Sequence, residues 1–146
     1  MNEFGLAFHH FGLAVRSPEQ AGLFLQALGY QAGVPVYDPL QKVNLAMFYH
    51  AEMPGVEVIW PGAETSPIDR MLKRNDTMVY HLCYTCADPA AALSKMADAG
   101  FEVLPATEPR AAILFNGLEV SFYFVAGFGL IELIHCNSAE SPKIKT

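Results

Sequence analysis

The sequence predicts an α+β fold made of two tandem βαβββ modules, whose curved mixed sheets surround a cleft. The first observation is an internal repeat: His10 and His81 are each followed by a proline eight residues later and a glycine nineteen residues later. The second is that each copy combines one amphipathic helical segment with several strand-like runs. The third is that 146 residues with a 52% hydrophobic share can bury a substantial common core.

The first module, about residues 8–60, begins with a strand-like run at residues 8–15. Ser17 then provides an N-cap hydroxyl, Pro18 suits the first helical position, and Gly29 suits the left-handed position that ends a helix. The predicted buried stripe of this helix consists of Ala21, Phe24, Leu25 and Leu28. Three further strands complete the module at residues 30–36, 42–49 and 55–60.

The second module, about residues 78–136, follows a linker at about 61–77 and repeats the plan. A short linker helix carries Arg70, Lys73 and Arg74; these could contact an anionic substrate, but we favour a solvated face. Residues 79–86 form the first strand, Asp88 and Pro89 start the helix, and Gly100 ends it. The helical stripe consists of Leu93, Met96 and Ala97. Strands follow at residues 101–104, 119–125 and 129–135, residues 111–114 are either a strand edge or an apolar loop, and the polar tail at 137–146 is expected to fray.

Composition and charge exclude several function classes. A formal net charge of −6 argues against a nucleic-acid or anionic-membrane partner, and no apolar run is long enough to span a membrane. The N-terminus lacks the pattern of a secretion signal, so we expect a cytoplasmic protein. Three cysteines do not suggest a disulfide framework. Cys83 and Cys86 have C-x-x-C spacing, but residues three apart on a strand point to opposite faces, so we do not predict a redox or zinc site.

The repeat gives each module one histidine near its start and one glutamate near its end. Glu57 in VEVIW and Glu132 in IELIH share the pattern apolar-Glu-apolar-Ile-aromatic, and they follow His10 and His81 by 47 and 51 residues. Both glutamates sit in apolar strands, where a carboxylate without a partner is costly. A divalent cation held by all four side chains would provide that partner.

Two imidazoles and two carboxylates suit Co²⁺, Ni²⁺, Mn²⁺, Zn²⁺ or Fe²⁺, and an octahedral ion would keep two positions for water or substrate. The residues that share a strand face with the histidines are small, which leaves space beside the imidazoles. These neighbours are Gly12, Ala14, Cys83 and Thr85. The alternative is two histidines hydrogen-bonded to two glutamates without metal. His9, His50 and His135 are weaker ligand candidates.

Paired βαβββ modules with this His and Glu placement resemble the vicinal-oxygen-chelate superfamily, over about residues 10–135. HFGLAV, VEVIWPGAETSPIDRML, VYHLCYTCAD and GLIELIH are similar to motifs of its methylmalonyl-CoA epimerase family. The resemblance implies His10, Glu57, His81 and Glu132 as ligands of a divalent metal ion, and it implies a homodimer.

Two departures from the family pattern bear on the chemistry. The position matching the family's catalytic glutamate is Asn44, an amide that cannot accept a substrate proton but could contact substrate. The family's glycine-rich turn is replaced by EPRAAILFNGL, which suits a more hydrophobic substrate. Glu119 occupies the mirror place of Asn44 and could act as the base, as could Glu132. Ser121 and Tyr123 could orient the substrate, while Ala14 stands where glyoxalase I has an arginine for glutathione.

Three functions remain open from the sequence. The first is a divalent-metal-dependent lyase, isomerase or epimerase, acting through a metal-stabilised enolate on a small oxygen-chelating substrate that is acyl-CoA-like or hydrophobic. The second is a non-catalytic protein of the same fold that binds or sequesters an apolar small molecule. The third is an Fe²⁺ dioxygenase, although such sites usually use three protein ligands and Glu57 would be a fourth.

Overall fold

The computed structural model describes residues 2–137, which contain ten strands and three α-helices and confirm the α+β class. These residues form two compact units, one of residues 10–80 and one of residues 2–9 together with 81–137. The units match the two halves of the sequence repeat except at two strands that cross their borders. These are β1 (Leu6–Val15), which enters residues 10–80 at His10, and β6 (Thr77–Cys86), which leaves them after Tyr80.

Residues 10–80 form a mixed sheet with strand order β2-β4-β5-β1, in which β3 also pairs with β4. β1 and β5 are parallel, and the other neighbours are antiparallel. After β1 the elements are α1 (Pro18–Ala27), β2 (Gln31–Ala32), β3 (Val36–Asp38), β4 (Val43–Tyr49), β5 (Gly55–Pro61) and α2 (Pro67–Leu72).

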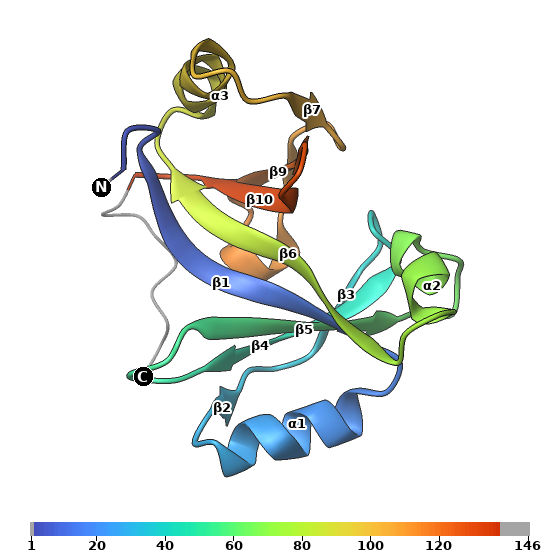
Figure 1. Ribbon diagram of the computed structural model, residues 1–146. Coiled ribbons are helices and arrows are strands. Elements are labelled where there is room, and N and C mark those ends of the chain that lie inside the picture. Colours follow the sequence, from blue (N-terminus) through green and yellow to red (C-terminus); the bar gives the residue numbers. More distant parts are fainter. Residues whose placement is uncertain (1, 138–146) are drawn as a thin grey trace. The chain divides into compact units, whose positions relative to one another are not determined.

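One face of this sheet packs against α1, which lies along the strands in Figure 1. The buried residues of this core are Val15, Leu25, Tyr30, Ala46, Phe48, Val56 and Val58. Successive side chains of a strand alternate between faces, so the neighbours of these core residues, including Glu57, lie on the other face. Glu57 is therefore held by a strand whose opposite face packs in the core under α1.

Helix α1 differs from its prediction in two respects. The Ser17 side chain makes no capping bond and contacts the exposed Glu19 carboxylate instead. Only Leu25 of the predicted stripe is fully buried, whereas Phe24 is 66% exposed and Leu28 is 46% exposed. A ten-residue helix lying flat on a sheet buries a narrower stripe than the sequence spacing indicates.

The strand predicted at residues 30–36 is divided into β2 and β3. Gly33 donates its backbone N–H to the Met47 carbonyl, and its nearest backbone neighbour would lie 2.8 Å from an added Cβ. Pro35 cannot donate to a ladder, so residues 33–35 interrupt the strand.

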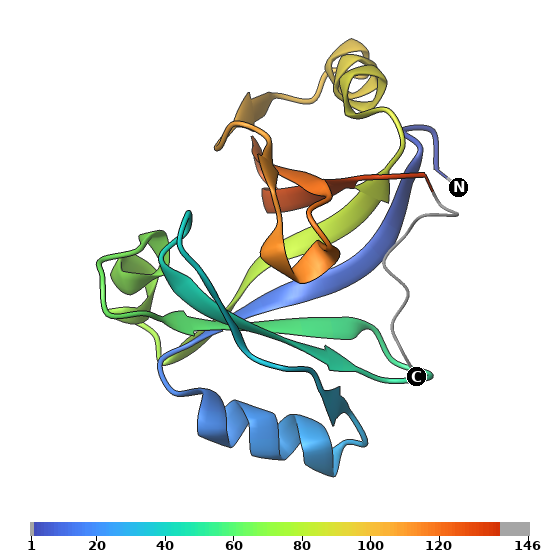
Figure 2. The same ribbon diagram turned by 180° about the vertical axis from the view of Figure 1, so that it is seen from behind.

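The second unit repeats this topology with strand order β6-β10-β9-β7, and β8 also pairs with β9. β6 and β10 are parallel, while β9 is antiparallel to β10 and to β7. After β6 come α3 (Pro89–Asp98), β7 (Val103–Pro105), β8 (Arg110–Ala111), a 3-10 turn (Ile113–Phe115), β9 (Glu119–Val125) and β10 (Gly129–His135). The predicted alternatives for residues 111–114 are therefore resolved as a strand end followed by the 3-10 turn, drawn in orange in Figure 2.

Helix α3 begins as predicted, because the Asp88 carboxylate accepts a hydrogen bond from the Ala91 N–H at 3.0 Å. Its buried residues are Ala92 and Met96, and Leu93 is half-buried, whereas the predicted Ala97 is exposed. They pack on one face of the sheet against Leu6, Cys86, Tyr123, Ile131 and Leu133. Each unit thus has one helix-covered face and one face that carries a buried histidine and glutamate.

The cysteine and membrane predictions can be compared with the described residues. Cys86 belongs to the core under α3, while Cys83 lies opposite Glu132 on the other face, so the C-x-x-C sulfurs point apart as predicted. Within residues 2–137 no helix has the length and apolar character needed to cross a membrane. The tail predicted to fray is residues 137–146. Of these, the structure describes Asn137, and residues 138–146 lie outside the described part.

The core under α3 supplies a test of the second unit. We expect Leu133→Ala to lower the free energy of unfolding by about 2–5 kcal/mol, because the side chain is fully buried and a cavity would remain. Leu104→Ala, at a position that is 54% exposed, is the matched control and should change it far less. Chemical denaturation of both variants checks this, and equal losses would contradict the assigned core.

Candidate functional site

The first His–Glu couple lies in residues 10–80. The parallel register places Gly12 of β1 opposite Glu57 of β5, and alternation puts His10 on the same face as Gly12. His10 Nε2 is 3.8 Å from Glu57 Oε2. The histidine is fully buried and the glutamate is 5% exposed. A carboxylate and an imidazole are therefore held together away from water, as the repeat predicts.

The second couple lies in the other unit and is built in the same way. Glu132 of β10 pairs with Cys83 of β6, so His81 lies on the same face two residues away. His81 Nε2 is 3.0 Å from Glu132 Oε2, and both residues are buried. The Phe122 ring packs against the imidazole at an interplanar angle of 86°, with the ring centroids 5.4 Å apart. This contact restricts rotation of the His81 ring.

The geometry of each couple fits two ligands of one metal ion. Nitrogen and oxygen donors lie roughly 2.0–2.2 Å from Zn²⁺, so two donors at a right angle are about 3 Å apart and wider angles give longer separations. The observed separations of 3.0 Å and 3.8 Å fall in this range. In both couples the approaching atoms are Nε2 and Oε2, so within each couple one donor nitrogen lies close to one donor oxygen.

The β1 neighbours of the first couple are small, as predicted. The β4–β5 register adds Tyr49, a residue that the sequence analysis missed. Gly12 and Ala14 lie on the face of His10, and Met47 of β4 pairs with Glu57. Two residues beyond Met47, Tyr49 lies on the same face. Burial raises the pKa of the Tyr49 phenol, and the Glu57 charge raises it further. The alternation of KVNLAMFY, combined with the β4–β5 register, is the signal that could have identified it.

Asn44 does not share the face of the first couple. It pairs with Trp60, which is three residues from Glu57 on β5 and therefore points to the opposite face. The Asn44 side chain donates a hydrogen bond to the Pro61 carbonyl at 3.1 Å. The residue from which the sequence predicted a substrate contact is therefore directed to the α1 side of the sheet.

Glu119, Ser121 and Tyr123 likewise lie on the face opposite to Glu132. Glu132 pairs with Phe122, so the odd-numbered residues of β9 point to the α3 side. Tyr123 is buried in the core under α3. Glu119, one of the two candidate bases, therefore lies on the face opposite to the second couple, because the β9–β10 register places Phe122 beside Glu132.

Ser121 and Glu119 instead contact His135 of β10. The Ser121 hydroxyl is 2.7 Å from His135 Nε2, and His135 Nδ1 is 3.8 Å from the Glu119 carboxylate. This is the connectivity of a Ser–His–acid triad, but its burial is inverted: the serine is fully buried and the acid is exposed. A nucleophile must be accessible to substrate, so the arrangement satisfies a buried hydroxyl and supplies no nucleophile.

The stability of the second unit should depend on pH through His135. Burial lowers the pKa of its imidazole below 6.5, an effect that Glu119 opposes. The unfolded chain therefore takes up a proton before the folded one, and stability present above about pH 6.5 is lost as pH falls toward the folded pKa.

We expect wild type to lose stability relative to His135→Gln over this window, in denaturation measured between pH 7.5 and pH 5.5. Glu119→Gln removes the opposing charge and should steepen the loss; identical curves for all three proteins would contradict this assignment.

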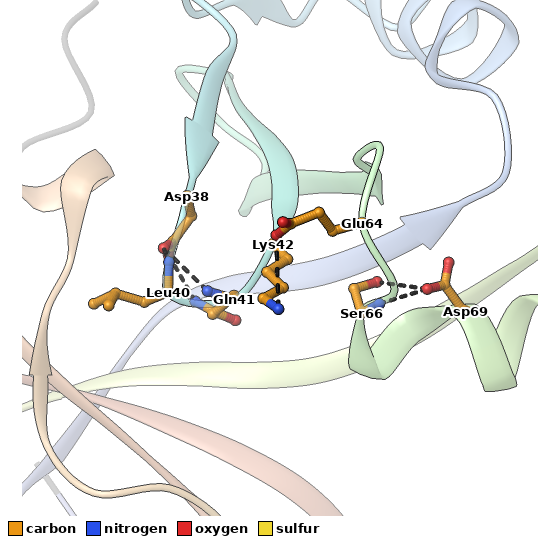
Figure 3. Close-up of polar contacts among 7 residues, drawn as sticks. All are labelled: Asp38, Leu40, Gln41, Lys42, Glu64, Ser66 and Asp69. Atoms are coloured by element: carbon orange, nitrogen blue, oxygen red, sulfur yellow. Dashed lines mark hydrogen bonds and ion pairs between the residues drawn. The ribbon is translucent and has the colours of Figure 1, made fainter.

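A second group of buried polar contacts in residues 10–80 is structural. The buried Asp38 carboxylate accepts hydrogen bonds from the N–H groups of Leu40 and Gln41 and from the Gln41 side chain (Figure 3). These three hydrogen bonds satisfy the buried carboxylate, so Asp38 shapes the turn into β4. In the same view the Asp69 carboxylate accepts hydrogen bonds from the backbone N–H and the hydroxyl of Ser66 at the start of α2.

The remaining candidates agree with the weaker interpretations. His50 Nδ1 accepts hydrogen bonds from the Glu52 and Met53 N–H groups and so orders its own loop. His9 packs against the ring of Phe115. The basic residues of the linker are exposed; they are Arg70, Lys73 and Arg74.

The protein consists of two modules of βαβββ topology. Each module has a buried His–Glu couple on the face away from its helix, and both side-chain types are common metal ligands. The family model described as "Glyoxalase/Bleomycin resistance protein/Dioxygenase superfamily" matches residues 9–124. The chain belongs to this superfamily, which confirms the resemblance drawn from the sequence.

Relatives with named activities are similar over most of their length. An ethylmalonyl-CoA/methylmalonyl-CoA epimerase of Cereibacter sphaeroides is 31% identical over 129 residues, which cover 86% of this chain and 94% of that protein. Among solved structures, the methylmalonyl-CoA epimerase of Mycobacterium tuberculosis has a TM-score of 0.71 at 20% identity, covering 92% of this chain and 89% of that one. A Streptomyces coelicolor methylmalonyl-CoA epimerase variant in complex with 2-nitronate-propionyl-CoA has a TM-score of 0.72 at 24% identity, covering 93% and 98%. The two structural matches establish likeness of fold.

Proposed function

We propose that the protein is a divalent-metal-dependent epimerase that acts on a 2-substituted acyl-CoA thioester. The observation that carries the proposal is the pair of buried His–Glu couples at duplicated positions. The 31% identical relative, named as an ethylmalonyl-CoA/methylmalonyl-CoA epimerase, supports the same reaction class.

In this proposal His10, Glu57, His81 and Glu132 together hold one ion. Two carboxylates balance its charge, and the mixed nitrogen and oxygen donors suit Co²⁺, Ni²⁺, Mn²⁺, Zn²⁺ or Fe²⁺. When bound, the ion would supply electrostatic stabilisation of the negative charge that develops on a substrate carbonyl oxygen. The couples themselves are buried, so that stabilisation would act where water does not screen it.

Proton transfer in this proposal belongs to Glu132. Of the two candidate bases, it alone lies on the face of a His–Glu couple, since Glu119 points to the α3 side. Its carboxylate takes the proton from the substrate α-carbon while the C–H electron pair moves into the thioester carbonyl. Delivery of a proton from solvent water to the opposite side of the resulting enolate inverts the carbon, and Glu132 returns its proton to water.

The experiment is α-proton exchange of methylmalonyl-CoA and ethylmalonyl-CoA in deuterated water, followed by mass spectrometry. We expect incorporation of one deuterium by the metal-loaded protein, its loss on chelation and its recovery when Co²⁺ or Ni²⁺ is added. Tight binding of these thioesters without exchange would instead favour the alternative of a non-catalytic binding protein. Oxygen consumption with catechols under Fe²⁺ would favour the dioxygenase alternative.

We also propose a homodimer. Several large apolar side chains of the first unit are exposed, including Leu23, Phe24 and Val34, and a second copy would cover such a surface. Light scattering coupled to gel filtration tests this, and a mass of one chain at micromolar concentration would contradict it. A cytoplasmic location stays a prediction from the sequence.

A further inference from the structure

We propose that Tyr49 is a catalytic residue of the acyl-CoA reaction, whose phenol donates a hydrogen bond to the substrate oxygen that gains negative charge. The inference rests on the proposed function and adds a residue to it. Three features of residues 10–80 carry the assignment: the strand face, the cross-strand row and the burial of the phenol.

Tyr49 lies on the face of the first couple. In the β4–β5 ladder Met47 pairs with Glu57 and Phe48 pairs with Val56. Continuing this register by one residue places Tyr49 in the row of Gly55, the first residue of β5. Alternation then places the Tyr49 side chain on the Glu57 face, while Phe48 points into the core under α1.

The row that contains Tyr49 leads directly to His10. Gly55 is the β5 residue of this row, and it pairs with His10 in the parallel β1–β5 ladder. Two strand spacings separate the Tyr49 and His10 backbones by about 10 Å, a gap that the two side chains can span together. Gly55 has no side chain to occupy the space between them. On the other side of β4, an added Cβ at Gly33 would lie 3.5 Å from the Tyr49 ring, so the glycine there also leaves room for the ring.

The environment of the phenol suits a hydrogen-bond donor. Tyr49 is half-buried, so part of its side chain remains accessible to a ligand. A tyrosine phenol is a neutral donor at neutral pH, and burial raises the pKa of this one. A neutral donor on the same strand face as a carboxylate and an imidazole can bind an oxygen whose negative charge increases during the reaction.

The test is Tyr49→Phe, compared with Tyr37→Phe as the matched control. Tyr37 pairs with Asn44 and so lies on the opposite face of the same sheet. We expect Tyr49→Phe to lower the kcat of α-proton exchange by about 10- to 100-fold, with KM changed much less, since the donor acts mainly on developing charge. Tyr37→Phe should retain the wild-type kcat.

Two further measurements separate the possible outcomes. Titration with Co²⁺ should give the same affinity for wild type and Tyr49→Phe; a parallel loss of cobalt affinity and kcat would overturn the inference, because Tyr49 would then act by positioning Glu57. Binding of 2-nitronate-propionyl-CoA should weaken at least tenfold in Tyr49→Phe. Unchanged kcat and unchanged nitronate binding would refute the role of Tyr49 and leave the epimerase proposal intact. A wild-type protein that neither exchanges the α-proton nor binds the nitronate would refute both.

Discussion

Replacement of His81 by alanine is expected to abolish binding of the single divalent ion and, with it, α-proton exchange. His81 is fully enclosed, and its Nε2 lies 3.0 Å from Glu132, so no exposed side chain can take its place. Loss of a direct ligand should weaken the metal affinity by more than the roughly 10- to 100-fold that loss of an outer-shell partner costs. Elemental analysis and titration with Co²⁺ measure the effect.

The stoichiometry of the same titration tests whether the two couples share one ion. A shared ion gives one equivalent per chain, and His10→Ala and His81→Ala each remove it. Two independent sites would give two equivalents, with one retained in each single variant. His50→Ala is the control, because this histidine accepts hydrogen bonds from backbone groups of its own loop and packs against Tyr30, so the metal content should stay unchanged. Retention of a full equivalent by His81→Ala would contradict the proposal.

The elements of the fold and the two couples were predictable because the repeated residues have strong local conformational or chemical preferences. Pro89 and Gly100 bracket a helix in the second module as Pro18 and Gly29 do in the first, and both glycines adopt positive φ. Glu57 and Glu132 are the two carboxylates that stand inside apolar strands, so duplication identified them without knowledge of pairing. Local chemistry therefore determined which segments form elements and identified the two buried glutamates, whereas the buried Asp38 depends on a turn that the sequence analysis did not single out.

The faces of the outer strands were not predictable in the same way. Asn44 was singled out because it matches the family's catalytic glutamate, and Glu119 because it occupies the mirror place of Asn44. Each lies across a hairpin from the glutamate of its own module. A change of one residue in register moves a side chain to the opposite face, and loop conformation sets that register. The same uncertainty concealed Tyr49, whose face is defined only by the pairing of Met47 with Glu57.

The duplication makes the two glutamates alike in sequence, so their separate roles provide the second large prediction. We expect Glu132→Gln to lower α-proton exchange by about 10²- to 10⁴-fold, because an amide can still contribute an oxygen ligand but cannot accept the substrate proton. Glu57→Gln is the mirror-image control and should retain most of the exchange rate, since in this proposal Glu57 only binds the ion.

Metal content must be measured for both variants, because each substitution also removes one negative charge from the ligand set. If Glu132→Gln and Glu57→Gln both keep the ion, a selective loss of exchange in Glu132→Gln assigns proton transfer to Glu132. Equal losses in two metal-replete variants would remove that assignment and make the two couples equivalent in chemistry as well as in sequence. The environments already differ: Phe122 packs against the imidazole of the Glu132 couple, whereas Met47 pairs with Glu57. The aromatic ring beside His81 restricts the movement of the His81 imidazole and so of the Glu132 carboxylate that it contacts. For this reason we expect Glu132, rather than Glu57, to be held in a fixed position relative to the substrate carbon.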